Sequence, residues 1–316
     1  MNARPEIAVV VSTKNRERRL ASLIESLRGQ DLDPDRFEVV IVDNASTDGT
    51  AALLDYERSA GGLSLRLVGN RVDRGTAASR NAGWRAADAP LIAFTDDDCE
   101  LDPGWLRALL EAANRHPGAL LQGRTEPIPR ERTALGPFSR TKKVTSLGPF
   151  YETCNIAYPR ELLERLGGFD AEAFPGWGGE DTDLAWRALA EGADAVFVPE
   201  ALAYHAVNQL GPAGTLRLAL GWSDAMGVLP RHPGIRRHLH HRFFWKRSHE
   251  LFLFAVLGAL LARRVPPAAL LAVPYLRQLR GRAAGNPELI AFLPMNDALE
   301  MVAAARGGIR HRTPII

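Results

Sequence analysis

The sequence predicts an α/β fold in which a largely parallel sheet is covered by helices on both faces. Four apolar, β-branched runs alternate with segments of helical periodicity, and they cover residues 7–11, 37–42, 63–68 and 91–95. Continuous apolar runs of this kind are typical of parallel strands that are buried on both faces. Apolar residues make up 46% of the 316 residues and charged residues 24%, which excludes a disordered or polytopic membrane protein.

The helical segments are recognised by their period. After the first strand, Leu20, Leu23, Ile24 and Leu27 fall at i, i+3, i+4 and i+7, which predicts an amphipathic helix. The remaining expected elements are a helix at 103–115, a strand at 153–158, helices at 160–166 and 180–191, and a basic helical region from 211. The Pro- and Arg-rich stretch between residues 125 and 150 is long for a plain connection, so we expect a functional loop or lid there.

Polar residues follow three of the four predicted strands. They are found at residues 12–16, 43–50 and 96–99. In open α/β sheets the ligand lies beyond the carboxyl ends of the strands. We therefore expect these three segments to meet at one edge of the sheet and to form the functional site.

The most distinctive of these segments is the run of three carboxylates at Asp96, Asp97 and Asp98. Adjacent carboxylates at a buried strand end repel one another unless a cation compensates their charge. Mg²⁺ and Mn²⁺ prefer carboxylate oxygens and complete their coordination with water and phosphate. The run therefore predicts a divalent cation, Mn²⁺ or Mg²⁺, and the alternative is an acidic solvated turn.

The other two segments indicate a nucleotide. Asp43 follows the second strand, where its carboxylate is suited to accept the imide N–H of uracil or thymine; the alternative is a capped turn that binds nothing. Gly75 opens a predicted helix whose backbone N–H groups suit a phosphate, with Arg80 further along the same helix. An exposed helix arginine is the alternative for Arg80.

Seven motifs in a fixed order resemble the family 2 glycosyltransferases with the GT-A fold. They lie between about residues 6 and 206 and read V-V-V-S-T-K-N-R, V-D-N-A-S-T-D-G-T, A-S-R-N-A-G, T-D-D-D-C, C-N-I-A-Y-P, G-G-F-D and G-E-D-T-D-L-A-W-R. The resemblance implies a Rossmann-like mixed sheet flanked by helices. It also implies a catalytic domain at 1–210, with a donor half at about 1–100, an acceptor half at about 101–210, and a separate basic helical region at 211–316.

The resemblance also implies a role for each motif residue. The donor would be bound by Thr13, Asn15, Arg16, Asp43, Arg80, Asp96 and Asp97. Asp98 is the expected direct metal ligand, with Asp96 and His205 as further ligands, although an isolated histidine is as often structural. Asp181 is the expected catalytic base and Glu180 the second candidate; the alternative is an acidic helix N-terminus favoured by the helix dipole. Trp177 and Asn155 would contact the acceptor, with a core tryptophan as the alternative for the former.

These roles describe an inverting transfer from a UDP-, dTDP- or GDP-sugar to a hydroxyl of a glycan or a lipid-linked acceptor. A sugar nucleotidyltransferase would share the sheet and the metal carboxylates, but residues 12–16 contain no glycine of the kind its phosphate loop needs. A non-catalytic sugar-nucleotide-binding module is the non-enzyme alternative, and both intact acidic motifs count against it. A processive synthase is disfavoured because the Q-x-x-R-W motif is missing.

The C-terminal third differs in charge from the rest of the chain. Residues 1–205 carry 24 Lys/Arg against 32 Asp/Glu, whereas residues 206–316 carry 15 against 5. The apolar run at 251–262 is shorter than the roughly 20 residues of a membrane span. We expect the segment 236–282 to bind an anionic membrane surface, and the alternatives are a helix packed on the catalytic domain or a homodimer interface. No nucleic-acid-binding motif accompanies the charge, so no nucleic-acid partner is expected.

Cysteine usage and the N-terminal residues bear on location. Two cysteines, Cys99 and Cys154, cannot form a disulfide framework, and the apolar run at the N-terminus is shorter than a signal-peptide core. The expectation is a cytoplasmic protein, attached peripherally to the inner face of the cell membrane if the basic segment binds lipid.

Overall fold

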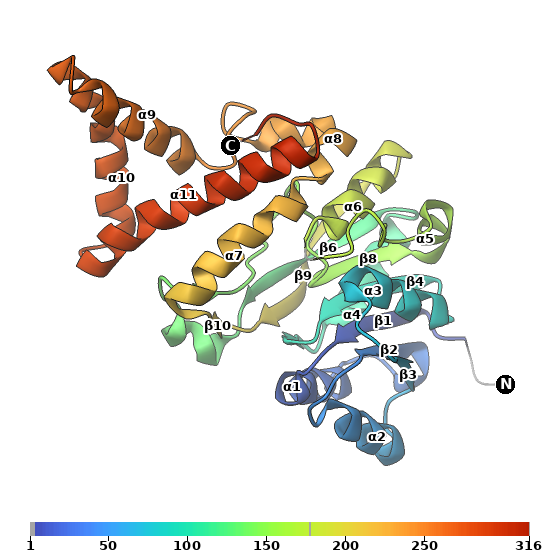
Figure 1. The fold of residues 1–316 in the computed structure, drawn as a ribbon. Coiled ribbons are helices and arrows are strands. Elements are labelled where there is room, and N and C mark those ends of the chain that lie inside the picture. The colour runs from blue at the N-terminus through green and yellow to red at the C-terminus, as the bar shows by residue number, and fades with distance from the viewer. Residues whose placement is uncertain (1–3, 177, 316) are drawn as a thin grey trace. The chain divides into compact units, whose positions relative to one another are not determined.

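The computed structural model describes residues 4–176 and 178–315. The chain divides into two compact units, and Figure 1 traces both. The α/β unit contains the residues up to 135 together with 140–208, and the helical unit contains 136–139 together with the residues from 209 onward.

The α/β unit is built on an eight-stranded sheet with the order β3-β2-β1-β4-β8-β6-β9-β5. Its strands are β1 (Ile7–Thr13), β2 (Phe37–Asn44), β3 (Leu65–Asn70), β4 (Leu91–Asp96), β5 (Cys99–Leu101), β6 (Leu120–Pro127), β8 (Asn155–Pro159) and β9 (Ala195–His205). Its helices are α1 (Glu17–Arg28), α2 (Thr50–Ala60), α3 (Gly75–Ala86), α4 (Trp105–Arg115), α5 (Arg160–Leu166) and α6 (Glu180–Ala190), with the 3₁₀ helices η1 (Pro34–Arg36) and η2 (Pro129–Ala134). The two-residue strands β7 (Ser139–Arg140) and β10 (Asn208–Gln209) lie where the chain passes between the units.

The first four strands form the parallel half of the sheet, as the apolar runs predicted. β1 lies between β2 and β4, and its pairing places Thr13 beside Asp43 and Ser12 beside Asp96. β8 runs antiparallel to both β4 and β6, so the sheet is mixed, as the resemblance implied. The register confirms that the polar residues after β1, β2 and β4 share one edge of the sheet.

The sheet is buried on both faces because alternate residues of its central strands enter different cores. Val9 and Val11 of β1 pack with Leu23 of α1 and Trp105 of α4 on one face. Val10 packs on the other face, with side chains of α3 and α6. This two-sided burial is the physical reason why the strands read as continuous apolar runs.

Three strands of the sheet, β5, β6 and β9, were not predicted from the sequence. β9 is eleven residues long although only its last five residues formed a recognisable apolar run, because Pro199 and Glu200 interrupt the pattern. β5 follows the carboxylate run directly and pairs antiparallel with β9, which sets Cys99 opposite His205. This pairing brings His205 to the edge where the carboxylates lie.

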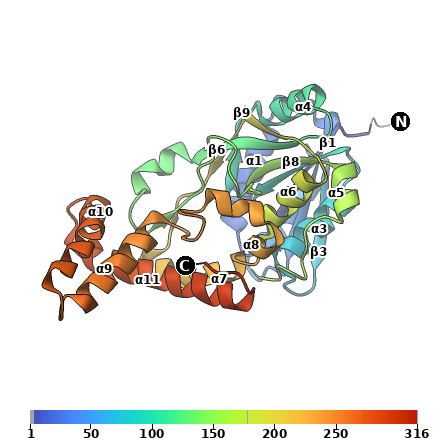
Figure 2. The same ribbon diagram turned by 90° about the horizontal axis from the view of Figure 1, so that it is seen from above.

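The described residues of the helical unit form five α-helices. They are α7 (Gly211–Ala225), α8 (Val228–Arg231), α9 (Arg247–Leu261), α10 (Val273–Ala283) and α11 (Pro287–Arg310), with the 3₁₀ helices η3 (Pro233–His238) and η4 (Pro266–Ala272). α11 packs along α7, and Figure 1 shows α9, α10 and α11 as three sides of a triangle, with η4 where α9 turns into α10. Figure 2 shows α11 alongside α7 from above. Among the described residues, no helix has the length and apolarity needed to cross a bilayer.

Candidate active site

The three consecutive carboxylates after β4 point to different partners. Asp96 accepts a hydrogen bond from Arg80 at 2.8 Å, and Asp97 accepts one from the Thr13 hydroxyl at 2.8 Å. Asp98 is buried; its Oδ2 lies 3.0 Å from the Asn208 amide nitrogen and 3.4 Å from the Arg16 guanidinium. The run is therefore not a solvated turn, because each carboxylate has a fixed orientation.

His205 completes this cluster from the end of β9. Its Nδ1 lies 2.9 Å from the Ala206 carbonyl oxygen, and because a carbonyl only accepts, the ring carries a proton on Nδ1. In the neutral ring Nε2 then presents a lone pair, 3.4 Å from Oδ1 of Asp98. Two acceptors that face each other in a buried position are stabilised by a cation between them. The set of two carboxylates and one imidazole fits Mn²⁺, which accepts oxygen and nitrogen ligands.

Arg80 connects the carboxylate run to the second acidic motif. Its guanidinium is buried and donates to Asp96 at 2.8 Å and to Oε1 of Glu180 at 2.9 Å. Burial acts to raise the pKa of Asp96, but the charge of Arg80 outweighs it and holds that pKa below its usual value. The reading of Arg80 as an exposed helix arginine is therefore wrong. Its charge is matched by two carboxylates, which it holds in place, and its contact with the donor stays a prediction.

The residue after Arg80 explains two further motifs. The Asn81 side chain donates to the Phe169 carbonyl at 2.7 Å and accepts from the Phe169 amide at 2.9 Å. Trp84 Nε1 also donates to the side-chain oxygen of Asn81, at 2.9 Å. Phe169 in turn packs edge-on against Phe94 of β4, with ring centroids 5.2 Å apart. The motifs A-S-R-N-A-G and G-G-F-D are thus bonded to each other and support the site rather than line it.

Glu180 and Asp181 open α6, where left-handed Gly179 turns the chain into the helix. Glu180 is buried, and within the described part of the chain its Oε2 has no hydrogen-bond partner. Asp181 is half-buried, and burial together with the charge of Glu180 raises its pKa to about 7, against the opposing effect of Lys142 and Arg80. Asp183 is turned away and pairs with Arg187 at 2.8 Å. A carboxyl whose pKa lies near neutrality is suited to proton transfer.

The candidate nucleobase contacts lie around the ends of β1 and β2. Asn15 has a left-handed backbone conformation. Its side-chain oxygen accepts from the Thr47 backbone N–H at 2.7 Å, and its backbone N–H donates to the Ser46 hydroxyl at 2.9 Å. Asp43 caps the same turn by accepting from the Ser46 backbone at 3.0 Å. The structure brings Asn15 and Asp43 together across two neighbouring strands, beside Thr13 and Arg16.

Two cations at the site were not singled out from the sequence. Arg140 and Lys142 lie in the Pro- and Arg-rich stretch that was expected to be a functional loop. Burial lowers the pKa of Arg140, and the charges of Asp96 and Asp98 oppose this effect. The charge of Lys142 acts to lower the pKa of both Asp96 and Asp181. The basic character of the stretch was the available signal, but its lack of periodicity gave no means of telling which cations turn inward.

Asn155 and Trp177 were the two residues expected to contact the acceptor. The structure does not bring Asn155 to the site, because its side chain is fully buried and its amide donates to the carbonyls of Arg124 and Ala201, both at 2.8 Å. Trp105 donates to its amide oxygen at 2.8 Å. Asn155 is therefore a structural residue that ties β8 to β6 and β9. Trp177 lies outside the described residues.

Three clusters in the described residues bring metal-ligand atoms within 4.8 Å of one another. They are Asp96, Asp98 and His205; His240, His241 and Glu250; and His249, Asp297 and Glu300. The first belongs to the α/β unit and the other two belong to the helical unit.

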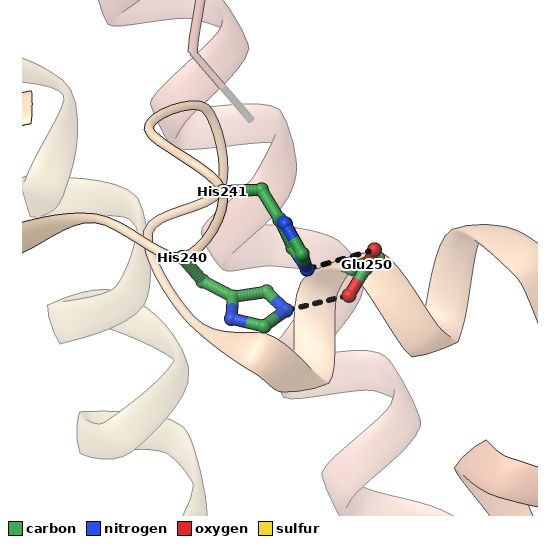
Figure 3. Close-up of side chains that lie close together, drawn as sticks. All are labelled: His240, His241 and Glu250. Carbon is green, nitrogen blue, oxygen red and sulfur yellow. Dashed lines mark hydrogen bonds and ion pairs between the residues drawn. The ribbon is translucent and has the colours of Figure 1, made fainter. Parts of the chain in front are cut away.

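In the two clusters of the helical unit, side chains of the protein itself already contact the carboxylates. His240 and His241 converge on the two oxygens of Glu250 in Figure 3, at 2.5 and 3.6 Å. In the other cluster, Lys246 bonds both oxygens of Glu300 and Arg282 bonds both oxygens of Asp297. In the Asp96, Asp98 and His205 cluster, Nδ1 of the histidine is committed to the Ala206 carbonyl, so in the neutral ring the lone pair on Nε2 faces Asp98.

Comparison with known proteins places most of the chain within two family models. The model described as glycosyl transferase family 2 matches residues 8–169, and the model described as N-terminal domain of galactosyltransferase matches residues 138–209. Together they include every residue of the site described above.

Two curated relatives are similar over more than half of the chain. Validoxylamine A glucosyltransferase of Streptomyces hygroscopicus subsp. limoneus is 31% identical over 228 residues, covering 60% of this chain and 49% of that protein. Pre-mycofactocin glycosyltransferase of Mycobacterium tuberculosis is 26% identical over 241 residues, covering 72% of this chain and 48% of that protein. The chain thus spans about half the length of these relatives.

A solved structure is similar over both units. The mannosyltransferase PcManGT from Pyrobaculum calidifontis, in complex with GDP-Man and Mn²⁺, has a TM-score of 0.71 and 25% identity to this chain, covering 96% of this chain and 87% of that one.

Proposed function

The chain belongs to glycosyl transferase family 2 and has the GT-A fold, and on that premise we propose that it transfers a sugar from a nucleotide diphosphate donor to a hydroxyl of a glycan or lipid-linked acceptor. The observation that carries this proposal is the cluster of Asp96, Asp98 and His205 at the carboxyl edge of the sheet. Its neighbours Asn15 and Asp43 suit a nucleoside, so base, diphosphate and cation would be bound side by side.

The donor would lie along the edge formed by β1, β2 and β4. Asp43 and Asn15 would bind the nucleoside, and Thr13 orients Asp97 beneath it through their 2.8 Å hydrogen bond. A divalent cation held by Asp96, Asp98 and His205 would neutralise charge on the diphosphate as the nucleotide leaves. Arg16, Arg140 and Lys142 would add positive charge on the same leaving group.

The acceptor proton would be taken by Asp181. A direct displacement needs one base on the acceptor side, and attack opposite the leaving group inverts the anomeric carbon. The pKa of about 7 leaves much of the carboxyl ionised at neutral pH while keeping it basic enough to accept a proton. Arg80 donates a 2.9 Å hydrogen bond to neighbouring Glu180 and another to Asp96. It would therefore link the acceptor side of the site to the donor side.

The test is a panel of UDP-, dTDP- and GDP-sugars, each with Mn²⁺ or Mg²⁺, followed by thermal shift and by release of nucleoside diphosphate. One donor class should raise the melting temperature in the presence of the cation and undergo slow hydrolysis. Anomeric configuration of the product, read by NMR, tests inversion. A chain that binds no sugar nucleotide with either cation would overturn the proposal.

A further inference from the structure

The helical unit exposes a concentrated apolar surface. Ten of the large apolar side chains that the described structure leaves exposed lie between Leu253 and Leu276, although this stretch is a small fraction of the chain. On α9 they recur at helical spacing, with Leu253, Leu257, Leu260 and Leu261 at i, i+4, i+7 and i+8. One stripe of α9 therefore faces solvent although it has the composition of a core.

The hairpin that carries this surface is well packed on its inner side. α9 contacts η4 through Gly258, where an added Cβ would come within 2.7 Å of the Ala268 carbonyl oxygen. Phe252 of α9 packs edge-on against Tyr275 of α10, with ring centroids 5.3 Å apart. We call the outward side of α9, η4 and the start of α10 the apolar face. It is the outer side of a folded hairpin, not an unfolded segment.

A buried polar network attaches this hairpin to α11. The Tyr275 hydroxyl donates to Asp297 at 2.8 Å, and His249 and Lys246 bond Glu300 at 3.0 and 2.7 Å. Burial opposes the effect, but His249 and Lys246 hold the pKa of Glu300 at about 2. The network fixes α9 and α10 in orientation, so the apolar face is presented as one surface.

The charge around the apolar face identifies what covers it. Between residues 236 and 282 the sequence has ten Lys/Arg and a single acidic residue, Glu250. Arg263 and Arg264 are exposed where α9 ends, and Arg277 and Arg280 are exposed on α10. A second copy paired through the same face would bring these cations together, whereas an anionic lipid surface would attract them.

We propose that the apolar face docks on an anionic phospholipid leaflet, with the leucines of α9 among the acyl chains and the surrounding arginines at the headgroups. α9 has 15 residues and is therefore about 22 Å long, shorter than a hydrocarbon core of about 30 Å. The hairpin enters one leaflet only. The half-buried Phe243, Phe244 and Trp245, expected from the sequence to be the aromatic anchor, are secondary to the leucine stripe.

Vesicle flotation of the full chain tests this proposal without any sugar transfer, so its failure is distinct from failure of the proposed function. The vesicles are phosphatidylcholine alone, or mixtures in which about one lipid in three is phosphatidylglycerol. The intact chain should float with the anionic vesicles, and added salt should weaken but not abolish binding. Exchanging Arg263 and Arg264 for Gln should weaken binding about 30-fold at low salt.

The apolar contribution is tested by Leu257→Asn, Leu260→Asn and Leu261→Asn combined. All three side chains are exposed, so the fold should persist, and binding should fall about 100-fold at every salt concentration. Val302→Asn with Ile309→Asn is the matched control, since both side chains are exposed on α11 outside the apolar face. A triple variant that floats like the intact chain overturns the proposal. So does an intact chain that ignores anionic vesicles but forms a dimer that the triple variant dissociates.

Discussion

Each unit of the molecule contains a buried carboxylate cluster, and the two clusters differ in how their charge is balanced. In the helical unit, Asp297 receives two hydrogen bonds from Arg282, and Glu300 receives two from Lys246. The pKa of Glu300 is held at about 2 despite its burial. In the α/β unit, burial and the charge of Glu180 raise the pKa of Asp181, which lies close to the Asp96, Asp98 and His205 cluster through Arg80, to about 7.

The difference separates a cluster that is complete within the fold from the one proposed to bind a cation. A carboxylate whose charge is matched by bonded cations stabilises the fold and needs nothing further. In the α/β unit Asp98 lies 3.4 Å from both Arg16 and His205, too far for a strong charge-assisted hydrogen bond. Both clusters contain histidine and carboxylates, so composition alone does not distinguish them. Their electrostatic balance does.

The largest effect should come from the cation site. Asp98→Asn is expected to lower the transfer rate by about 10⁴-fold, because several kcal/mol of charge stabilisation depend on the bound cation. Chelation of the wild-type protein should cause a similar loss that Mn²⁺ restores. The variant should fold normally, since one of several mutually repelling carboxylates is removed. Full turnover by the wild-type protein in excess chelator would contradict this prediction and would mean that the Asp98 cluster is structural, like that of Glu300.

The next largest effect should come from Asp181. Asp181→Asn should reduce turnover by about 10³-fold while donor affinity, measured by calorimetry, stays within about twofold. Because the base acts when ionised and its pKa is raised to about 7, wild-type turnover should rise as pH increases through about 7 and then level off. The variant should lose this rise. An unchanged rate would transfer the base role to Glu180.

Most of the α/β unit was predictable because its strands are buried on both faces. The apolar runs located β1 to β4, and the rule that ligands bind beyond strand ends located Thr13, Asp43 and Asp96 at one edge. What could not be predicted depends on pairing between distant segments. Pro199 and Glu200 obscured β9, so only the resemblance, and not the strand pattern, associated His205 with Asp98. The β5–β9 pairing is what brings the two side chains within 3.4 Å.

Side-chain direction was the second limit of the sequence. Asn155 lies in a motif of the resemblance, and nothing in the sequence indicates that its amide is fully used by the Arg124 and Ala201 carbonyls. Arg140 and Lys142 belong to a stretch without periodicity, so their approach to the carboxylates could not be inferred. In the helical unit the basic and apolar composition was evident, but which face of α9 remains exposed depends on its packing against η4.

The structural cluster should give a smaller effect, confined to stability. Glu300→Gln is expected to destabilise the protein by about 3 kcal/mol, because it leaves Lys246 and His249 without their buried partner. Turnover per folded molecule should be unchanged. The folded pKa is about 2 against an ordinary 4.5, so this contribution is present above pH 4.5 and is lost as pH falls towards 2. Glu288→Gln, at an exposed position of the same helix, is the control for chemical denaturation.

The smallest effect is the response of stability to the cation itself, and it tests the comparison most directly. A cation that binds only the folded protein stabilises it by about 2.7 kcal/mol at a hundredfold excess over its dissociation constant. Mn²⁺ should therefore raise the melting temperature of the wild type by a few degrees in calorimetry. Glu300→Gln should start lower and show the same rise, because its cluster is complete without metal. Asp98→Asn should show none. If Mn²⁺ raises the melting temperature of Asp98→Asn fully but not that of Glu300→Gln, the cation binds in the helical unit. Electrostatic balance would then fail to distinguish a structural carboxylate cluster from one that binds a cation.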